Sequence, residues 1–441
     1  MLCSTLETLS PLLNQLDLRE STEGYLDPLS LYAIADSLGV RLAPGVRERQ
    51  SHPRYLTAMA VAAAVCASFD EDTVASDGVS PPWQVFEWLM VEGLVRTQSE
   101  DKPLVGLPGR DKVGRTLKDK VPVSARTYLK TPSVFGFHGV YRLLAKTLDV
   151  VNEDRLGELG YRLLSAWEKA QGLPGFYTTN SGVGQSVRQM LQTAVQEGLA
   201  AGHVTRYPGW RGWEFFNTHL HPNDFTHEEA QLIAIALLDE VTPYREQTLR
   251  FLTSREGQKA WVGRDEREFH QKLRPHATPD FTALLDAIDH YETFSRMLQD
   301  AFDDCLYHLS QYRHPQDFKQ LGDLPSIKAC SQAIPKLYRT VSDALSPFNE
   351  SSRFETTFRR FADPLPPAEW AETLLDHHRE VQNNKPPNGR APWLDWFANG
   401  KVMVRAGYVR EEGGRHTADY VHAYRTMPLY SFAMDLGMLS S

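Results

Sequence analysis

Residues 106–151 read GLPGRDKVGRTLKDKVPVSARTYLKTPSVFGFHGVYRLLAKTLDVV, and this stretch combines charge, turn residues and a helical pattern more strongly than any other part of the chain. Its first half is rich in basic side chains, which are Arg110, Lys112, Arg115, Lys118, Lys120, Arg126 and Lys130. Glycines give the backbone of this half conformational freedom. In the second half, apolar residues recur at helical spacing from Tyr141 onward and predict a short amphipathic helix. Cations on a glycine-rich loop suit the phosphate backbone of a nucleic acid, and Tyr128 is available to stack on a base. The sequence therefore predicts a basic loop that contacts DNA.

The overall charge restricts what this contact can be. The chain has 441 residues and a formal net charge of −9, whereas a protein that coats nucleic acid would be basic throughout. Any contact with DNA must therefore be local, with the acidic excess elsewhere. The four cysteines show no CxxC spacing, which indicates neither a zinc ribbon nor a disulfide scaffold and fits a reducing cytoplasm.

Targeting and membrane signals are weak. The longest apolar run, at 58–67, is too short and too rich in alanine to span a bilayer. The N-terminal residues include acids and no basic segment, so no signal peptide is predicted. We therefore expect a cytoplasmic protein without membrane contact.

The N-terminal segment reads as helices. The sequence AIADSLGV resembles the start of a helix-turn-helix, but the residues at 41–45 do not form a recognition helix. The alanine-rich run Tyr55–Ser68 predicts a helix buried at the centre of the N-terminal domain. Three arginines ahead of it, Arg47, Arg49 and Arg54, form either a second, weaker basic patch or the solvated start of a helix.

The region after the first linker has a winged-helix pattern. Residues 83–95 predict a strong helix, and Glu92–Arg96 is typical of a helix that runs into a strand. A second unit of this kind has a strand at 152–156 followed by a helix at 159–168. The alternative is that these are ordinary helices of a mixed α/β domain.

Histidines recur near the middle of the chain. His219 and His221 lie on a predicted strand with their side chains on the same side, and His227 follows after a turn. Three histidines this close suggest a metal site. However, Thr226 and Glu229 have the spacing of a capping box for the next helix, and no HExxH motif is present. We expect a structural role for these histidines and keep a metal site as the alternative.

The C-terminal half is predicted to be a helical bundle. A long helix runs from Thr278 to about Tyr312, and further helices lie at 324–345 and 367–382. On the long helix, the pairs Asp286/His290 and Asp304/His308 point the same way and predict a polar outer stripe. His377 and His378 on the last helix are predicted to lie on a solvated face.

After a linker at 383–392, the spacing of apolar residues changes from a helical pattern to that of β-strands. Residues 393–405 read as a β-hairpin with its tight turn at Asn399-Gly400, and 428–439 closes the chain as a helix.

The sequence therefore predicts a mainly α protein with some β structure (α+β). Winged-helix-like modules occupy its N-terminal half, a helical bundle its C-terminal half, and a small β-hairpin its C-terminus. The expected domains are a helical one at 1–75, a winged-helix-like region with the basic loop at 80–225, a helical one at 226–385, and the hairpin with its closing segment at 390–441.

Several segments resemble known sequences. LAPGV at 42–46 with RYL at 54–56, YLKTPSVFG at 128–136, and RAGY at 405–408 with YVHAYR at 420–425 are similar to segments of uncharacterised proteins encoded in bacterial anti-phage defence operons. The likeness is spread over most of the chain and includes no catalytic motif. It implies an accessory subunit that works beside a helicase or a nuclease.

Three hypotheses follow. The first is a non-enzymatic DNA-binding or scaffold subunit of a bacterial antiviral defence complex, which binds duplex phosphates through the basic loop. The second is a protein–protein adaptor without nucleic-acid contact, in which the basic loop meets an acidic partner. The third is a metal-dependent enzyme that uses His219, His221 and His227. No nucleophile motif, pair of catalytic carboxylates or phosphate-binding glycine loop stands out, which favours a non-enzymatic role without a cofactor.

Overall fold

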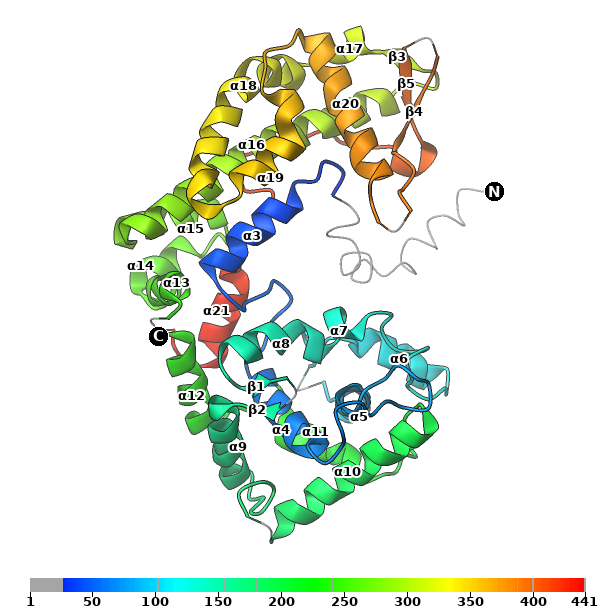
Figure 1. The fold of residues 1–441 in the computed structure, drawn as a ribbon, viewed down its shortest axis with the longest axis vertical. Helices are drawn as coiled ribbons and strands as arrows, with labels where there is room; N and C mark the ends of the chain where they lie inside the picture. Colours follow the sequence, from blue (N-terminus) through cyan, green and yellow to red (C-terminus); the bar gives the residue numbers. More distant parts are fainter. Residues whose placement is uncertain are drawn as a thin grey trace. The chain divides into compact units, whose positions relative to one another are not determined.

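The structure, a computed structural model, describes residues 27–100, 103–153, 155–179, 181–239, 241–386, 388–398 and 400–439. Helices account for 60% of it and strands for 4%, which confirms the predicted mainly α class with a small C-terminal hairpin. The described chain forms two compact units, and each unit joins segments that are far apart in the sequence (Figure 1).

Unit 1 consists of residues 27–41 and Ala260–Tyr424. Its elements in chain order are α3 (Tyr32–Leu42, whose last residue belongs to unit 2), α15 (Glu266–Leu273), η1 (Arg274–His276), α16 (Pro279–Ser310), β3 (Gln316–Asp317), α17 (Phe318–Gly322), α18 (Pro325–Leu345), η2 (Ser346–Phe348), α19 (Ser351–Phe358), η3 (Arg359–Phe361), α20 (Pro367–Asn383), β4 (Leu394–Trp396), β5 (Lys401–Val404) and η4 (Ala406–Tyr408).

Unit 2 consists of Leu42–Lys259 and residues 425–439. Its elements are α4 (Tyr55–Cys66), α5 (Pro82–Thr97), α6 (Arg110–Lys118), α7 (Pro132–Phe135), α8 (Phe137–Thr147), β1 (Val151–Asn152), β2 (Arg155–Leu156), α9 (Glu158–Ala170), α10 (Val183–Ala201), α11 (Gly212–Leu220), α12 (His227–Leu237), α13 (Pro243–Thr253), α14 (Arg255–Ala260, which ends at the boundary) and α21 (Thr426–Asp435).

The predicted helical bundle is present in unit 1. The long helix α16 packs against α18 and α20, as Figure 1 shows. Proline occupies the first turn of all three helices, where its missing N–H costs no intrahelical hydrogen bond. The predicted hairpin is also confirmed: β4 and β5 pair antiparallel, and β3 adds a third strand in the order β3-β5-β4.

Helix α4 organises unit 2. Residues Tyr55–Val65 of this helix are all buried, as predicted, because alanine side chains let neighbouring helices approach on every side. It packs against α5, α8, α9 and α10.

Two predicted strands are helical. Residues Gly93–Arg96 continue α5, so the first winged-helix unit lacks its predicted strand. In the second, a two-residue hairpin, β1–β2, does precede α9. The segment that holds Trp213 is also helical, as α11, because its aromatic side chains are buried at helical rather than alternating positions.

The prediction for His377 and His378 was wrong. Both side chains are buried, and they hydrogen bond to the carbonyl oxygens of Leu29 (2.9 Å) and Pro28 (3.0 Å). The backbone N–H of Trp393 donates to Nε2 of His378 at 3.0 Å. These histidines join the first described segment and the hairpin to α20. Burial lowers the pKa of each to about 4, so both are neutral near pH 7.

Candidate nucleic-acid interface

The predicted basic loop begins as a helix. Helix α6 turns Val113 and Thr116 inward, and its opposite face carries Lys112, Arg115 and Lys118 at intervals of three residues. Such spacing places the three cations on one face, rising about 4.5 Å from each to the next. Of the three glycines in this segment, Gly114 therefore lies within a helix, which the sequence did not suggest.

Gly109 fixes the start of α6. Its φ of +81° is a left-handed conformation, and a Cβ at this position would lie 2.3 Å from the hydroxyl oxygen of Tyr128. Only glycine fits both conditions. The basic residues at the other end, Arg115 and Lys118, lie in the last turn of α6, where cations interact favourably with the helix dipole.

The predicted site residues divide into two groups. Arg115, Lys118, Lys120, Arg126 and Lys130 are exposed, and Lys112 is half-buried. Arg110 and Tyr128 serve the fold instead. Arg110 pairs with Asp111 at 2.9 Å and donates to the carbonyl oxygen of Leu104 at 2.7 Å.

Tyr128 does not have the predicted exposure. Its side chain is 4% exposed, and its hydroxyl donates to Glu87 at 2.7 Å. The stacking role predicted for Tyr128 is therefore not open to it in this structure. The same carboxylate accepts from the backbone N–H of Phe137 (3.2 Å) and of His138 (3.0 Å). Glu87 thus ties the basic segment to the start of α8.

We expect a pH dependence from Glu87. Burial raises the pKa of this carboxyl from 4.5 to about 7. The folded state therefore holds the proton more tightly than the unfolded state, and stability is lost as the pH rises between these two values. Relative to Glu87→Gln, which mimics the protonated form, the wild-type free energy of unfolding should fall by about 2 kcal/mol between about pH 5 and pH 8.

Urea denaturation at several pH values measures this difference. Glu214→Gln is a matched control, because Glu214 is an exposed carboxylate of the same unit. Parallel pH profiles for wild type and Glu87→Gln would contradict the expected titration.

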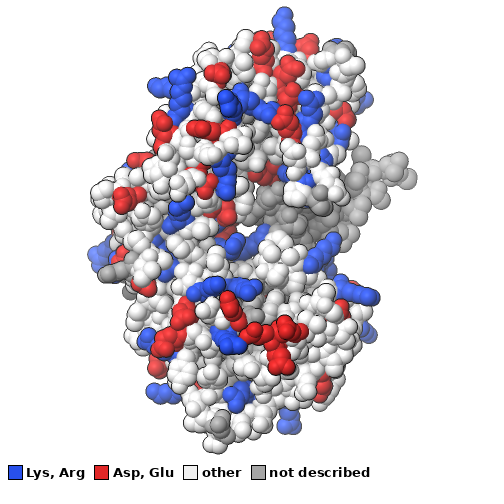
Figure 2. Space-filling view, in the orientation of Figure 1, with Lys and Arg blue, Asp and Glu red and all other residues white. Residues whose placement is uncertain are grey.

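Further cations lie on the same unit. Arg142 and Lys146 are exposed one turn apart on α8, and the sequence did not single them out. Figure 2 shows Lys and Arg side chains along the edge of unit 2 that carries α6 and α8, with acidic side chains gathered beside them. The basic surface is defined here as five exposed cations of unit 2, which are Arg115, Lys118, Lys120, Arg126 and Lys130.

The second basic patch does not form as one surface. Arg47 is exposed, but Arg49 lies over the ring of Phe135, 4.7 Å from its centroid. Arg54 is buried, with 1% of its surface exposed. Its guanidinium donates to the backbone carbonyls of His221 and His219 and lies 3.5 Å from a carboxylate oxygen of Glu229.

The histidines predicted as alternative metal ligands do not converge. His219 is on α11 with Nδ1 2.8 Å from Gln171, His221 is buried just beyond that helix, and His227 begins α12. Thr226 and Glu229 form the predicted capping box. In the part of the chain that the structure describes, no group of three or more His, Cys, Asp or Glu side chains is placed to hold a metal ion.

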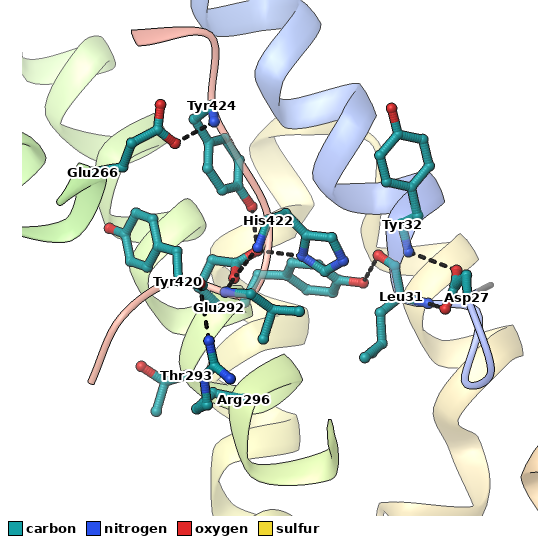
Figure 3. Close-up of polar contacts among 12 residues, drawn as sticks. Asp27, Leu31, Tyr32, Glu266, Glu292, Thr293, Arg296, Tyr420, His422 and Tyr424 are labelled. Atoms are coloured by element: carbon teal, nitrogen blue, oxygen red, sulfur yellow. Dashed lines mark hydrogen bonds and ion pairs between the residues drawn. The ribbon is translucent and has the colours of Figure 1, made fainter. Parts of the chain in front are cut away.

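A buried polar cluster holds the end of unit 1 (Figure 3). Glu292 of α16 is 1% exposed and accepts from the backbone N–H of Val421 (2.5 Å) and of His422 (3.2 Å). It also contacts Nδ1 of His422 and accepts from the hydroxyl of Tyr424, each at 2.7 Å. All four of these contacts go to one segment, residues 410–424, named here the strap.

The strap follows a polar stripe on α16. Arg296 donates to the carbonyl oxygens of residues 419 and 420, Asp300 accepts from the backbone N–H of 415 and 416, and Asp304 accepts from that of 414. With Glu292, these side chains recur every fourth residue along one face. The outer stripe predicted at Asp304 is therefore covered by the strap, because α16 supplies the hydrogen bonds that this irregular segment cannot make itself.

No protein-family model matches the chain, and the comparisons with curated proteins and with solved structures gave no significant match. None of the described helices combines the length and apolar character needed to span a membrane.

Proposed function

We propose that the protein binds duplex DNA through the basic surface of unit 2 and acts as a non-catalytic subunit of a larger complex. The observation that supports this most is the exposure of five cations within sixteen residues of an acidic chain. Of these, Lys118, Lys120, Arg126 and Lys130 have no carboxylate within ion-pair distance among the described residues. Positive side chains that the fold leaves to solvent suit the phosphate backbone, whose charge recurs every few ångströms.

The arrangement favours contact with phosphates over reading of bases. Lysine and arginine ends of this kind position a protein on the duplex, whereas sequence is read by side chains that enter a groove. Tyr128 is buried, so it does not offer an aromatic platform on which single-stranded bases could stack. The proposed binding is therefore to duplex DNA and independent of sequence.

The test is a triple charge reversal, Arg115→Glu, Lys118→Glu and Lys120→Glu. Because each phosphate contact contributes about 0.9 to the slope of log K against log salt, the slope should become shallower by about 3. Affinity at low salt should fall at least about tenfold, equally on every duplex sequence. Fluorescence anisotropy with labelled duplexes between about 50 and 200 mM salt measures both quantities.

The control makes the same charge change elsewhere on unit 2. Arg162, Lys169 and Arg211 are exposed and lie outside the basic surface, so reversing them should leave the salt slope nearly unchanged. Equal binding by wild type and the first triple variant, with both folded, would refute the proposal.

The defence role rests on the sequence resemblance alone. If the protein is an accessory subunit, a tagged copy should retain a helicase or nuclease partner after nuclease treatment of the lysate. Partners retained after that treatment, together with loss of DNA binding in the triple variant, would support a scaffold that carries its own DNA contact.

A further inference from the structure

Unit 2 contains a cavity of about 440 Å³ that the proposed DNA contact does not use. Its floor is one face of α4, formed by Met59, Ala62, Ala63 and Cys66. These positions recur at helical spacing (i, i+3, i+4 and i+7). The small side chains of the two alanines leave the space open, and the start of α5, the first turn of α8 and the β1–β2 hairpin complete the lining.

Aromatic side chains form part of the wall. Trp83 stacks on His138 with ring centroids 4.2 Å apart and planes 15° from parallel. Phe69 and Tyr177 also line the cavity, and Tyr177 meets Tyr161 edge-on at 5.9 Å. Burial, aided by nearby Arg142, lowers the pKa of His138 to about 3, so this ring is neutral near pH 7 and does not repel a cation.

The rim is acidic. Asp70, Glu71 and Glu153 line it and are exposed, against a single described cation, Arg155. Arg155 pairs with Glu71 at 2.5 Å, and both side chains are more than three-quarters exposed. Two carboxylates therefore remain as a surplus of negative charge around an aromatic and apolar interior.

We propose that this cavity binds a small organic cation, an amine carried on a flat aromatic body. The body would lie on the alanine floor beside Trp83, and the ammonium would lie at the rim near Asp70 and Glu153. The faces of aromatic rings attract cations, and they also pack against apolar groups. The volume falls within the range of about 300–1,000 Å³ that is usual for ligand pockets.

Three naphthalene probes that differ in charge test the proposal on the full chain. These are 1-naphthylmethylammonium, 1-naphthylmethanol and 1-naphthylacetate, measured by isothermal titration calorimetry. The cation should bind at least about tenfold more tightly than the anion, with the neutral alcohol between them, because only the cation complements the rim. Equal affinities for cation and anion, or no binding of the cation, would overturn the proposal.

A second readout locates the ligand. Of the described cysteines, Cys66 is half-buried in the cavity floor, whereas Cys305 and Cys330 are buried. Alkylation of Cys66 by iodoacetamide, followed by peptide mass spectrometry, should slow when the cation is present. An unchanged alkylation rate at saturating cation would place the ligand elsewhere and refute the site.

Two sets of variants test the contributions of the cavity floor and of the rim to binding separately. Ala63→Leu should fill the cavity and abolish binding of all three probes. Asp70→Asn with Glu153→Gln should weaken the cation about fivefold to tenfold and leave the alcohol unchanged, since exposed charges contribute modestly. The control Glu214→Gln removes an exposed charge outside the cavity. If Ala63→Leu does not fold, the rim pair decides: unchanged cation affinity there would overturn the proposal.

Discussion

Replacing Glu292 by alanine should lower the free energy of unfolding of unit 1 by about 3–5 kcal/mol. The carboxylate accepts from two backbone N–H groups and one tyrosine hydroxyl and also contacts a histidine nitrogen, all in the strap. Alanine would leave these donors without their acceptor at a position that is 1% exposed. The strap should then separate from α16.

Two measurements check this expectation. Chemical denaturation gives the loss in stability, and trypsin should cut the variant faster after Arg410 and Arg415, which lie in the strap. Glu412→Ala is the control, because Glu412 is an exposed carboxylate of the same segment, and it should change stability by less than about 0.5 kcal/mol. Equal trypsin resistance of the Glu292→Ala variant and the wild type would show that the cluster does not hold the strap.

Replacing Arg54 by methionine should destabilise unit 2 by a similar amount, about 3–5 kcal/mol. Arg54 and Glu229 are 1% and 0% exposed, and their charged groups approach to 3.5 Å. Methionine would leave Glu229 as a buried carboxylate without this counter-charge. It would also leave the carbonyl oxygens of His219 and His221 without the guanidinium that donates to them.

A second substitution tests the cause. Adding Glu229→Gln to Arg54→Met removes the uncompensated charge and keeps an amide oxygen for the Thr226 cap, so it should restore part of the loss. Arg47→Ala, at an exposed site seven residues earlier, should have an effect below about 0.5 kcal/mol. Denaturation of the four proteins in parallel measures these differences, and a double variant no more stable than the single one would exclude charge burial as the cause.

Local signals in the sequence predicted the long helices correctly. The capping box at Thr226 and the proline after Thr278 mark helix starts within one residue of those observed. The amphipathic pattern of α16 likewise acts over a few neighbouring residues, whereas Asn399 of the predicted Asn-Gly turn lies outside the described residues. Such features depend on short-range geometry, so a single sequence is enough to recognise them.

The errors came from packing between distant segments. Residues Glu92–Arg96 were predicted to run from a helix into a strand, yet α5 continues through them, and a Cβ at Gly93 would lie 2.4 Å from the ring of Phe216. This glycine lets α5 and α11 approach closely. His377 and His378 were expected in solvent because their partners, the carbonyls of residues 28 and 29, lie about 350 positions earlier. No local pattern reveals such a contact.

The sequence predicted which charged residues belong to the candidate DNA site, but it did not predict how the structure arranges them. The cluster of lysines and arginines in the sequence was enough to predict the basic surface, because these side chains are usually exposed. It did not reveal that α6 orders the segment, that Arg110 pairs with Asp111, or that Tyr128 is held inside by Glu87.

The composition of the two units has a consequence for synthesis. Helix α3 cannot pack against the rest of unit 1 until the ribosome has made all of Leu42–Lys259, which belongs to unit 2. Unit 2 in turn lacks α21, which packs on α13 and whose Asp435 meets His52, until residues 425–439 have been made. Neither unit can therefore complete its core before both of its segments have left the ribosome.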